Sequence, residues 1–193
     1  MRISHLALMG LILCACKSWR DDDESDEEHA TTQSSAGGGD STSSTREASM
    51  TGAGKNLTAD DLDFIEQAAY GGMFEVKSSE LALDEQVSSE TRSFAQMMVD
   101  DHGKANRELE GLASRKGFHV PVGLDADHQR KLDKLATLDG SEFERAYLDA
   151  QREGHDAAIE LFERAAKDCK DAELKSFASR TLPTLRKHRA ELD

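Results

Sequence analysis

The sequence predicts an all-α fold, an antiparallel bundle of four long helices with a short extra helix between the second and third long helices. Apolar residues recur at the helical period throughout residues 57–193, and the alternation typical of strands is missing there. The chain has 2 prolines, and both lie in this part. Its length is sufficient for one domain with one hydrophobic core.

The first two predicted helices cover residues 59–83 and 90–116. Thr58 and Asp61 form the pattern of a capping box, and Ser89 can cap the second helix. Each segment has one apolar stripe. The stripe of the first helix is Leu62, Ile65, Ala69, Met73, Val76 and Leu83. The stripe of the second helix is Phe94, Met98, Ala105, Leu109 and Leu112.

A short third helix is predicted over residues 126–138, after Asp125 as its cap. The fourth helix is predicted over residues 141–167, with Ser141 and Glu144 as a capping box. The short helix would therefore carry the chain from the second long helix to the next one.

The last predicted helix covers residues 172–192. Pro183 lies inside it and is expected to bend it, because proline lacks the N–H that a helix interior uses. Four long segments of similar length, joined by short connections and one crossover, are typical of a four-helix bundle.

The N-terminus has the pattern of a bacterial lipoprotein signal over residues 1–16. Arg2 precedes an apolar run, residues 3–13, that is too short to span a bilayer. Small Ala15 lies before Cys16, so we expect cleavage before Cys16 and lipid attachment to it. The alternative is an ordinary secretory signal with incidental cysteines.

Residues 17–56 have the composition of a disordered tether that is acidic and rich in Ser and Gly, and residues 57–193 form the predicted domain. Lys17 follows the expected lipid site, where an Asp would favour the inner membrane. We therefore expect an outer-membrane protein that faces the periplasm, held to the membrane by its lipid. The net charge of −14 and the lack of a basic patch exclude nucleic acid as an expected partner. No protein partner is specified.

The chain has 3 cysteines, and 2 of them fall in the predicted signal. Cys169 is then expected to be a free thiol at a helix end, because no partner is left for an intramolecular disulfide. A redox role would need a resolving cysteine, and none is present in the domain.

Polar residues near the apolar stripes are the candidates for chemistry. His102, His155 and His188 lie near the inner faces of three helices, and the first helix offers Glu75 on a flank and Glu80 on its inner face. Imidazole and carboxylate groups that converge in a bundle are typical ligands of a transition metal ion. The alternative is that each histidine is a hydrogen-bonded structural residue.

Two more specific centres are disfavoured. A di-iron carboxylate site uses Glu-x-x-His, but the residues three positions before the three histidines are Val99, Arg152 and Leu185. A haem held by Met98 and His188 is conceivable, although no spacing supports it.

Several stretches resemble one known family. They are Gly71 to Val76, Phe94 to His102, Asn106 to Leu109, Phe143 to Tyr147 with His155, and Leu182 to His188. Together they resemble the bacterial domain of unknown function 4142, a ferritin-like four-helix family of envelope proteins, over residues 57–193. The resemblance implies that the family-type polar positions are Glu75, Asp101, His102, Tyr147, His155 and His188. Asp101 and Tyr147 would support the ligands, whereas Glu80 is not among these positions.

Two functions follow as hypotheses. One is a lipid-anchored envelope protein with a non-enzymatic structural, stress or interaction role. The other is a metal-binding or redox-active bundle that uses His102, His155 and His188 as ligands, with Glu75 as the candidate fourth ligand. No motif for a catalytic nucleophile or a phosphate-binding loop is present, so the sequence names no reaction. Imidazoles more than about 7 Å apart could not share one ion, because metal–nitrogen bonds are near 2.0–2.1 Å.

Overall fold

The computed structural model describes residues 57–193, and the predicted signal, Cys16 and the tether lie outside them. The described part contains five helices and no strand, which confirms the all-α fold. The helices are α1 (Ala59–Asp84), α2 (Ser89–Arg115), α3 (Ala126–Leu135), α4 (Gly140–Asp168) and α5 (Ala172–Ala190).

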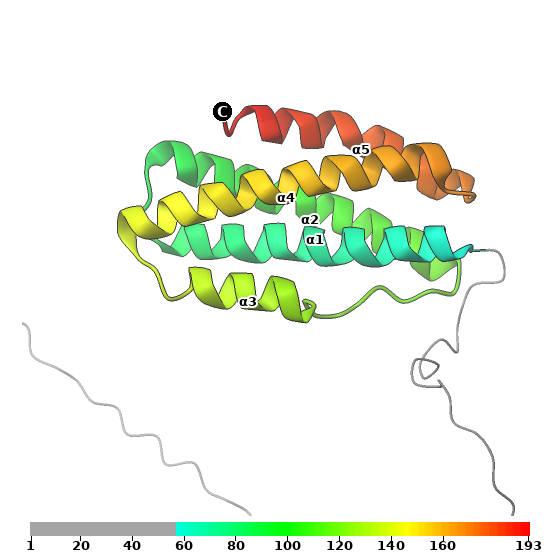
Figure 1. The fold of residues 1–193 in the computed structure, drawn as a ribbon, viewed down its shortest axis with the longest axis horizontal. Helices are drawn as coiled ribbons and strands as arrows, with labels where there is room; N and C mark the ends of the chain where they lie inside the picture. The colour runs from blue at the N-terminus through cyan, green and yellow to red at the C-terminus, as the bar shows by residue number, and fades with distance from the viewer. Residues whose placement is uncertain (1–56) are drawn as a thin grey trace, which may run out of the picture. The chain divides into compact units, whose positions relative to one another are not determined.

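The four long helices form the bundle (Figure 1). α1 packs against α2 and α4, while α5 packs mainly against α4 and less extensively against α2. Each of these neighbouring pairs is antiparallel, so α2 and α4 run in the same direction (Figure 1). The connection with α3 makes this order possible, because it returns the chain along the outside of α1 before α4 begins.

α1 and α3 begin at the predicted residues, Ala59 and Ala126. Thr58 and Asp61 form the reciprocal bonds of a capping box, and the Asp125 side chain accepts from the backbone N–H of His128. The side chain that caps α2 is Ser88, one residue earlier than the predicted Ser89. These caps satisfy N–H groups that have no partner within the helix.

The predicted capping box of α4 is wrong. The helix begins at Gly140, and its N-cap, Asp139, makes no side-chain capping bond. Glu144 instead accepts hydrogen bonds from the side chains of Ser88 and Thr91 at the start of α2. Glu144 therefore bonds to the start of α2 instead of to the start of its own helix. The local sequence pattern could not reveal this contact.

Pro183 lies inside α5, and the helix continues through it to Ala190. The carbonyl of Ser179 loses its helical partner there, because proline has no N–H. Ser179 is exposed, so water can hydrogen-bond to that carbonyl.

The hydrophobic core consists of two clusters, one toward each end of the bundle. The first contains Phe64, Ile65, Leu109, Leu112, Phe162, Leu174 and Phe177, among others. The second contains Phe74, Phe94, Met98, Leu135, Phe143, Tyr147 and Leu192, among others. Along α2, α4 and α5, the buried polar residues His102, Gln151, His155 and His188 lie between the two clusters, and Glu75 and Ser78 of α1 are buried next to Phe74 of the second cluster. A polar layer therefore interrupts the core at mid-length.

The predicted inner face of α1 is partly wrong. Its buried residues include Phe64, Ala68, Gly72 and Glu75, whereas Glu80 is exposed. α1 contacts three helices, α2, α3 and α4, so its buried arc is wider than one stripe. A single apolar stripe predicts the middle of such a wide buried surface but not its edges. For this reason the sequence wrongly placed Glu80 on the inner face.

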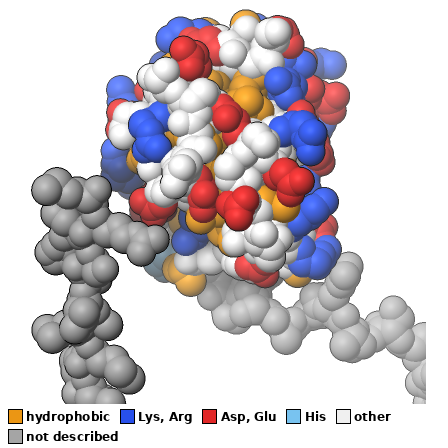
Figure 2. Space-filling view, turned by 90° about the vertical axis from the view of Figure 1, so that its left-hand side faces the viewer, with side chains coloured by type: hydrophobic (Ala, Val, Ile, Leu, Met, Phe, Trp, Pro, Cys, Tyr) orange, Lys and Arg blue, Asp and Glu red, His pale blue; other side chains and the backbone are white. Residues whose placement is uncertain are grey.

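None of the described helices combines the length and the apolar character needed to cross a membrane. The end of the bundle that Figure 2 shows carries acidic and basic side chains side by side, with hydrophobic side chains visible between them.

Candidate metal centre

Three buried histidines from three helices meet in the polar layer. His102 of α2, His155 of α4 and His188 of α5 each offer one ring nitrogen, and these nitrogens all lie within 4.8 Å of one another. The Nε2 atoms of His102 and His155 are 3.4 Å apart. His155 Nε2 and His188 Nδ1 are also 3.4 Å apart. The sequence predicted these three residues, and the structure brings them together.

This spacing fits one bound ion. A tetrahedral ion with bonds of 2.0–2.1 Å holds two ligand atoms about 3.3–3.4 Å apart. The ring centroids of the three imidazoles form a nearly equilateral triangle, with sides of 5.3, 5.4 and 5.5 Å. No other His, Cys or carboxylate atom of residues 57–193 joins the three nitrogens as a further ligand.

The outer nitrogens of two of the rings are held by acceptors. His155 Nδ1 lies 2.8 Å from the backbone oxygen of Gln151, and His188 Nε2 lies 3.0 Å from Asp101 Oδ2. Because a carbonyl and a carboxylate only accept, these ring nitrogens carry the protons. The inner nitrogens, His155 Nε2 and His188 Nδ1, are left with lone pairs that face each other. Such outer contacts are typical of metal-ligating histidines.

Burial keeps the imidazoles neutral. Burial, with a smaller contribution from neighbouring histidines, lowers the pKa of His102 to about 3 and the pKa of His155 to about 4. For His188, burial also lowers the pKa, and it outweighs the opposite effect of Asp101. A neutral imidazole is the form that binds a metal ion. Two lone pairs 3.4 Å apart repel each other unless a cation lies between them.

Glu75 lies beside the three ring nitrogens, but its carboxylate does not join them as a fourth ligand. Its Oε1 is 3.9 Å from His155 Nδ1, the nitrogen on the outer side of that ring. The carboxyl group is buried, its Oε2 has no hydrogen-bond partner, and burial raises its pKa to about 8. Gly154 makes room for it, since a Cβ there would lie 2.3 Å from Glu75 Oε1.

The two predicted supporting residues differ in position. Asp101 contacts His188 directly, as expected. The Tyr147 hydroxyl instead shares a hydrogen bond of 2.8 Å with Ser79, and its ring stacks on Phe143 in the second core cluster. Tyr147 therefore contributes packing next to the polar layer.

Two neighbours of the centre were not predicted. Ser78 accepts a hydrogen bond of 3.1 Å from Gln151 Nε2. Asn106 lies over Gly72, where a Cβ would be 2.0 Å from its Oδ1. A glycine on an inner helix face signals that something approaches closely, but it does not identify the approaching residue.

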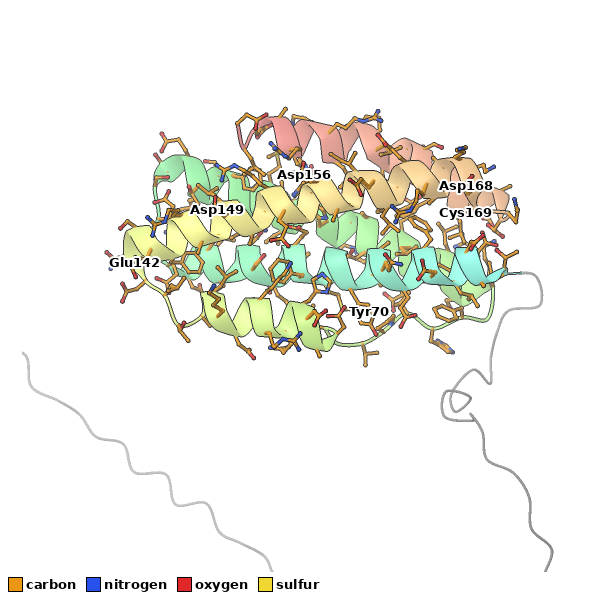
Figure 3. The ribbon with its side chains drawn as sticks, in the orientation of Figure 1. Tyr70, Glu142, Asp149, Asp156, Asp168 and Cys169 are labelled. Carbon is orange, nitrogen blue, oxygen red and sulfur yellow. The ribbon has the colours of Figure 1, made fainter. Side chains whose placement is uncertain are left out.

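A cavity of about 330 Å³ adjoins the centre. Its lining includes His102, His188 and Glu75. Tyr70, also in the lining, lies on the side of α1 that faces the start of α3 (Figure 3).

Cys169 is distant from this chemistry. It caps the C-terminus of α4 at the turn into α5 (Figure 3) and is a buried free thiol. Burial, together with Asp61, raises the pKa of the thiol to about 12, so it stays protonated and unreactive.

Comparison with known proteins identifies the family. The sequence model described as "Domain of unknown function (DUF4142)" matches residues 46–193. The chain belongs to the DUF4142 family. This DUF4142 domain is also similar in fold to a crystal structure of a DUF305 fragment from Deinococcus radiodurans, with a TM-score of 0.62 and 17% identity. That similarity covers 70% of this chain and 94% of the fragment, and it supports the fold alone. A search of curated proteins gives no significant match.

Proposed function

We propose that this DUF4142 domain binds one divalent transition metal ion through His102 Nε2, His155 Nε2 and His188 Nδ1. The observation that carries the proposal is the convergence of three buried ring nitrogens from three helices within 4.8 Å of one another, with two of the three spacings at the 3.4 Å of a tetrahedral ion. Asp101 and the Gln151 carbonyl support it, because they orient the lone pairs inward.

The three imidazole ligands limit which metal ions the site is suited to bind. Imidazole nitrogens suit zinc, copper, iron and nickel, whereas magnesium and calcium prefer oxygen ligands. Three protein ligands leave a tetrahedral ion with one position open to water or another small ligand, whereas closed structural sites use four protein ligands. The geometry therefore favours the metal-binding hypothesis over a purely structural role for the histidines.

The test is elemental analysis of the purified full-length chain. The metal-free protein is incubated separately with Zn²⁺, Co²⁺, Cu²⁺ and Ni²⁺, and unbound metal is removed by gel filtration. We expect about one ion per chain for at least one metal, and loss of that ion in His102→Ala. His119→Ala is the matched control, because His119 is exposed and lies outside the three-histidine group.

Two results would contradict the proposal. One is a wild-type chain that retains none of these ions. The other is a His102→Ala chain, helical by circular dichroism, that retains as much metal as the wild type. If that variant does not fold, the Co²⁺ absorption spectrum of the wild type decides, because imidazole ligands in a tetrahedral site give intense visible bands.

We further propose that the domain is held at the bacterial envelope by a lipid on Cys16, in the outer membrane and facing the periplasm, with residues 17–56 as the tether. The signal pattern of residues 1–16 supports this location. Cys16→Ser is expected to abolish fatty-acid labelling and to release the protein from the membrane fraction. Cys14→Ser, which leaves Cys16 in place, should remain labelled. Unchanged labelling of Cys16→Ser would refute the anchor.

A further inference from the structure

The cavity beside the three histidines connects the centre to solvent. Its lining includes His102 and His188 at the centre and the exposed side chains of Gln67 and Lys131. Exposed residues of α4, among them Glu153 and Glu160, line it as well, so the cavity opens where α1, α3 and α4 meet. The cavity therefore extends from the surface to the side chains of His102 and His188.

Glu75 supplies a polar group in this cavity that the protein leaves unsatisfied. Its Oε2 is buried and has no partner among the described residues, and the side chain lines the cavity. Buried polar atoms normally have a hydrogen-bond partner, and a bound molecule can supply one. Because the carboxyl group lies on the outer side of the His155 ring, it is displaced from the three nitrogens. This arrangement leaves the fourth position of the ion for a group that is not part of the protein.

The carboxyl group is held by the shape of α4. A side chain at position 154 would collide with Glu75 Oε1, at a Cβ distance of 2.3 Å. An added Cβ at Gly111 of α2, which does not line the cavity, would make only an ordinary contact of 3.6 Å with Arg115 Nη1. Gly154 thus seats Glu75, whereas Gly111 has no part in the cavity.

We propose that the cavity delivers an exchangeable small ligand, with one oxygen or nitrogen donor atom, to the fourth position of the bound ion, and that Glu75 hydrogen-bonds to it. The inference rests on the metal site proposed above and gives that site its ligand class. Three neutral imidazoles do not cancel the charge of a divalent ion, and Asp101 offsets part of it through His188. Water and small monoanions are therefore the ligands that fit.

The experiment uses the full-length chain loaded with Co²⁺ and titrated with azide, a small monoanion with a nitrogen donor. Visible absorption follows the coordination of cobalt, and elemental analysis gives the cobalt content of every variant. We expect a saturable spectral change in the wild type. Glu75→Leu should weaken azide binding about tenfold or more, the loss of one buried hydrogen bond. Glu75→Gln, which keeps a polar group, should stay within about threefold of the wild type.

The glycines provide a matched pair. Gly154→Ala should weaken azide binding because the methyl group displaces Glu75, while Gly111→Ala should leave it unchanged. A cobalt-loaded wild type whose spectrum does not respond to azide would overturn the inference, as would Glu75→Leu binding azide like the wild type. A chain that takes up none of the four ions contradicts both proposals, whereas cobalt uptake without an azide response contradicts this one alone.

Discussion

At the residue scale, Asp101 shows how one exposed carboxylate can act on a buried ligand. It accepts the hydrogen of His188 Nε2 at 3.0 Å and so keeps Nδ1 free for the ion. Asp101→Asn should weaken metal affinity by about 10–100-fold, because the amide removes the charge that fixes the ring. Competition with a chromophoric chelator measures the affinity.

Asp100 offers the control for that substitution. It is the adjacent residue, is exposed, and accepts a hydrogen bond from Gln96 on its own helix. Asp100→Asn should leave the metal affinity within about twofold of the wild type. Equal losses in both variants would mean that the general surface charge, and not the contact with His188, controls the ion.

Glu75 makes the metal-free protein sensitive to pH. Burial raises its pKa from the usual 4.5 to about 8, so the folded protein holds a proton that the unfolded chain releases. Below pH 4.5 the Glu75 carboxyl group is protonated in both the folded and the unfolded chain, so it does not make the free energy of unfolding depend on pH. As pH rises from 4.5 to about 8, the free energy of unfolding declines. Glu75→Gln should remove this decline, which amounts to at most about 5 kcal/mol.

Urea unfolding of the metal-free wild type and of Glu75→Gln between pH 5 and pH 9 tests this expectation. The variant should gain stability relative to the wild type as pH increases. Glu80→Gln is the control, since Glu80 lies on the same helix and is exposed. Parallel stability curves for the wild type and Glu75→Gln would show that Glu75 is ionised in the folded protein throughout this range.

At the element scale, Asp61 joins the start of α1 to the turn between α4 and α5. One carboxylate oxygen accepts from the Thr58 backbone and hydroxyl at 2.9 and 2.7 Å. The other accepts from the backbone N–H groups of Lys170 and Asp171 at 2.9 and 3.2 Å. Burial raises the pKa of Asp61, but these bonds outweigh it and hold the pKa below its usual value.

Asp61→Asn should therefore lower the free energy of unfolding by about 2–3 kcal/mol, because an amide nitrogen cannot accept the bonds that one oxygen now accepts. Denaturant unfolding at neutral pH measures the loss. Asp60→Asn, an exposed neighbour in the same first turn, should change stability by less than about 0.5 kcal/mol. A loss below about 0.5 kcal/mol in Asp61→Asn would show that the link contributes nothing to stability.

The helix ends show which local sequence signals are sufficient to predict a cap. Thr58 with Asp61, and Asp125, were predicted as caps and are caps, since each interaction stays within one turn of the chain. The Ser141–Glu144 pattern is equally good locally, yet Glu144 bonds to the start of α2. A local pattern predicts a cap only where no distant partner competes for the same side chain.

At the scale of the whole molecule, the polar groups buried at the centre of the bundle lower the stability of the metal-free domain. The two apolar clusters are separated by buried polar groups, among them Gln151 Oε1 and Glu75 Oε2 without partners. Buried polar atoms without partners are expensive, and three adjacent neutral imidazoles add repulsion between lone pairs. The metal-free domain should therefore be the less stable form.

Metal binding should raise the melting temperature of the chain. A ligand at 100 times its dissociation constant adds about 2.7 kcal/mol of stability, which corresponds to about 5–15 °C for a domain of this size. Removal of the ion with a chelator should reverse the increase. Thermal denaturation followed by circular dichroism measures it, with His155→Ala as the variant that should not respond. A metal-independent melting temperature would contradict a site at the centre of the fold.

The sequence by itself determined the helical fold, the approximate positions of the five helices and the three histidines, because helical periodicity and local caps act over a few residues. Only the tertiary structure decided the rest. It placed His155 Nε2 3.4 Å from the ring nitrogens of His102 and His188, set Glu75 on the outer side of the His155 ring next to Gly154, and left Glu80 in solvent. These positions depend on the rotation and depth of each helix against its neighbours, which packing across the whole bundle sets.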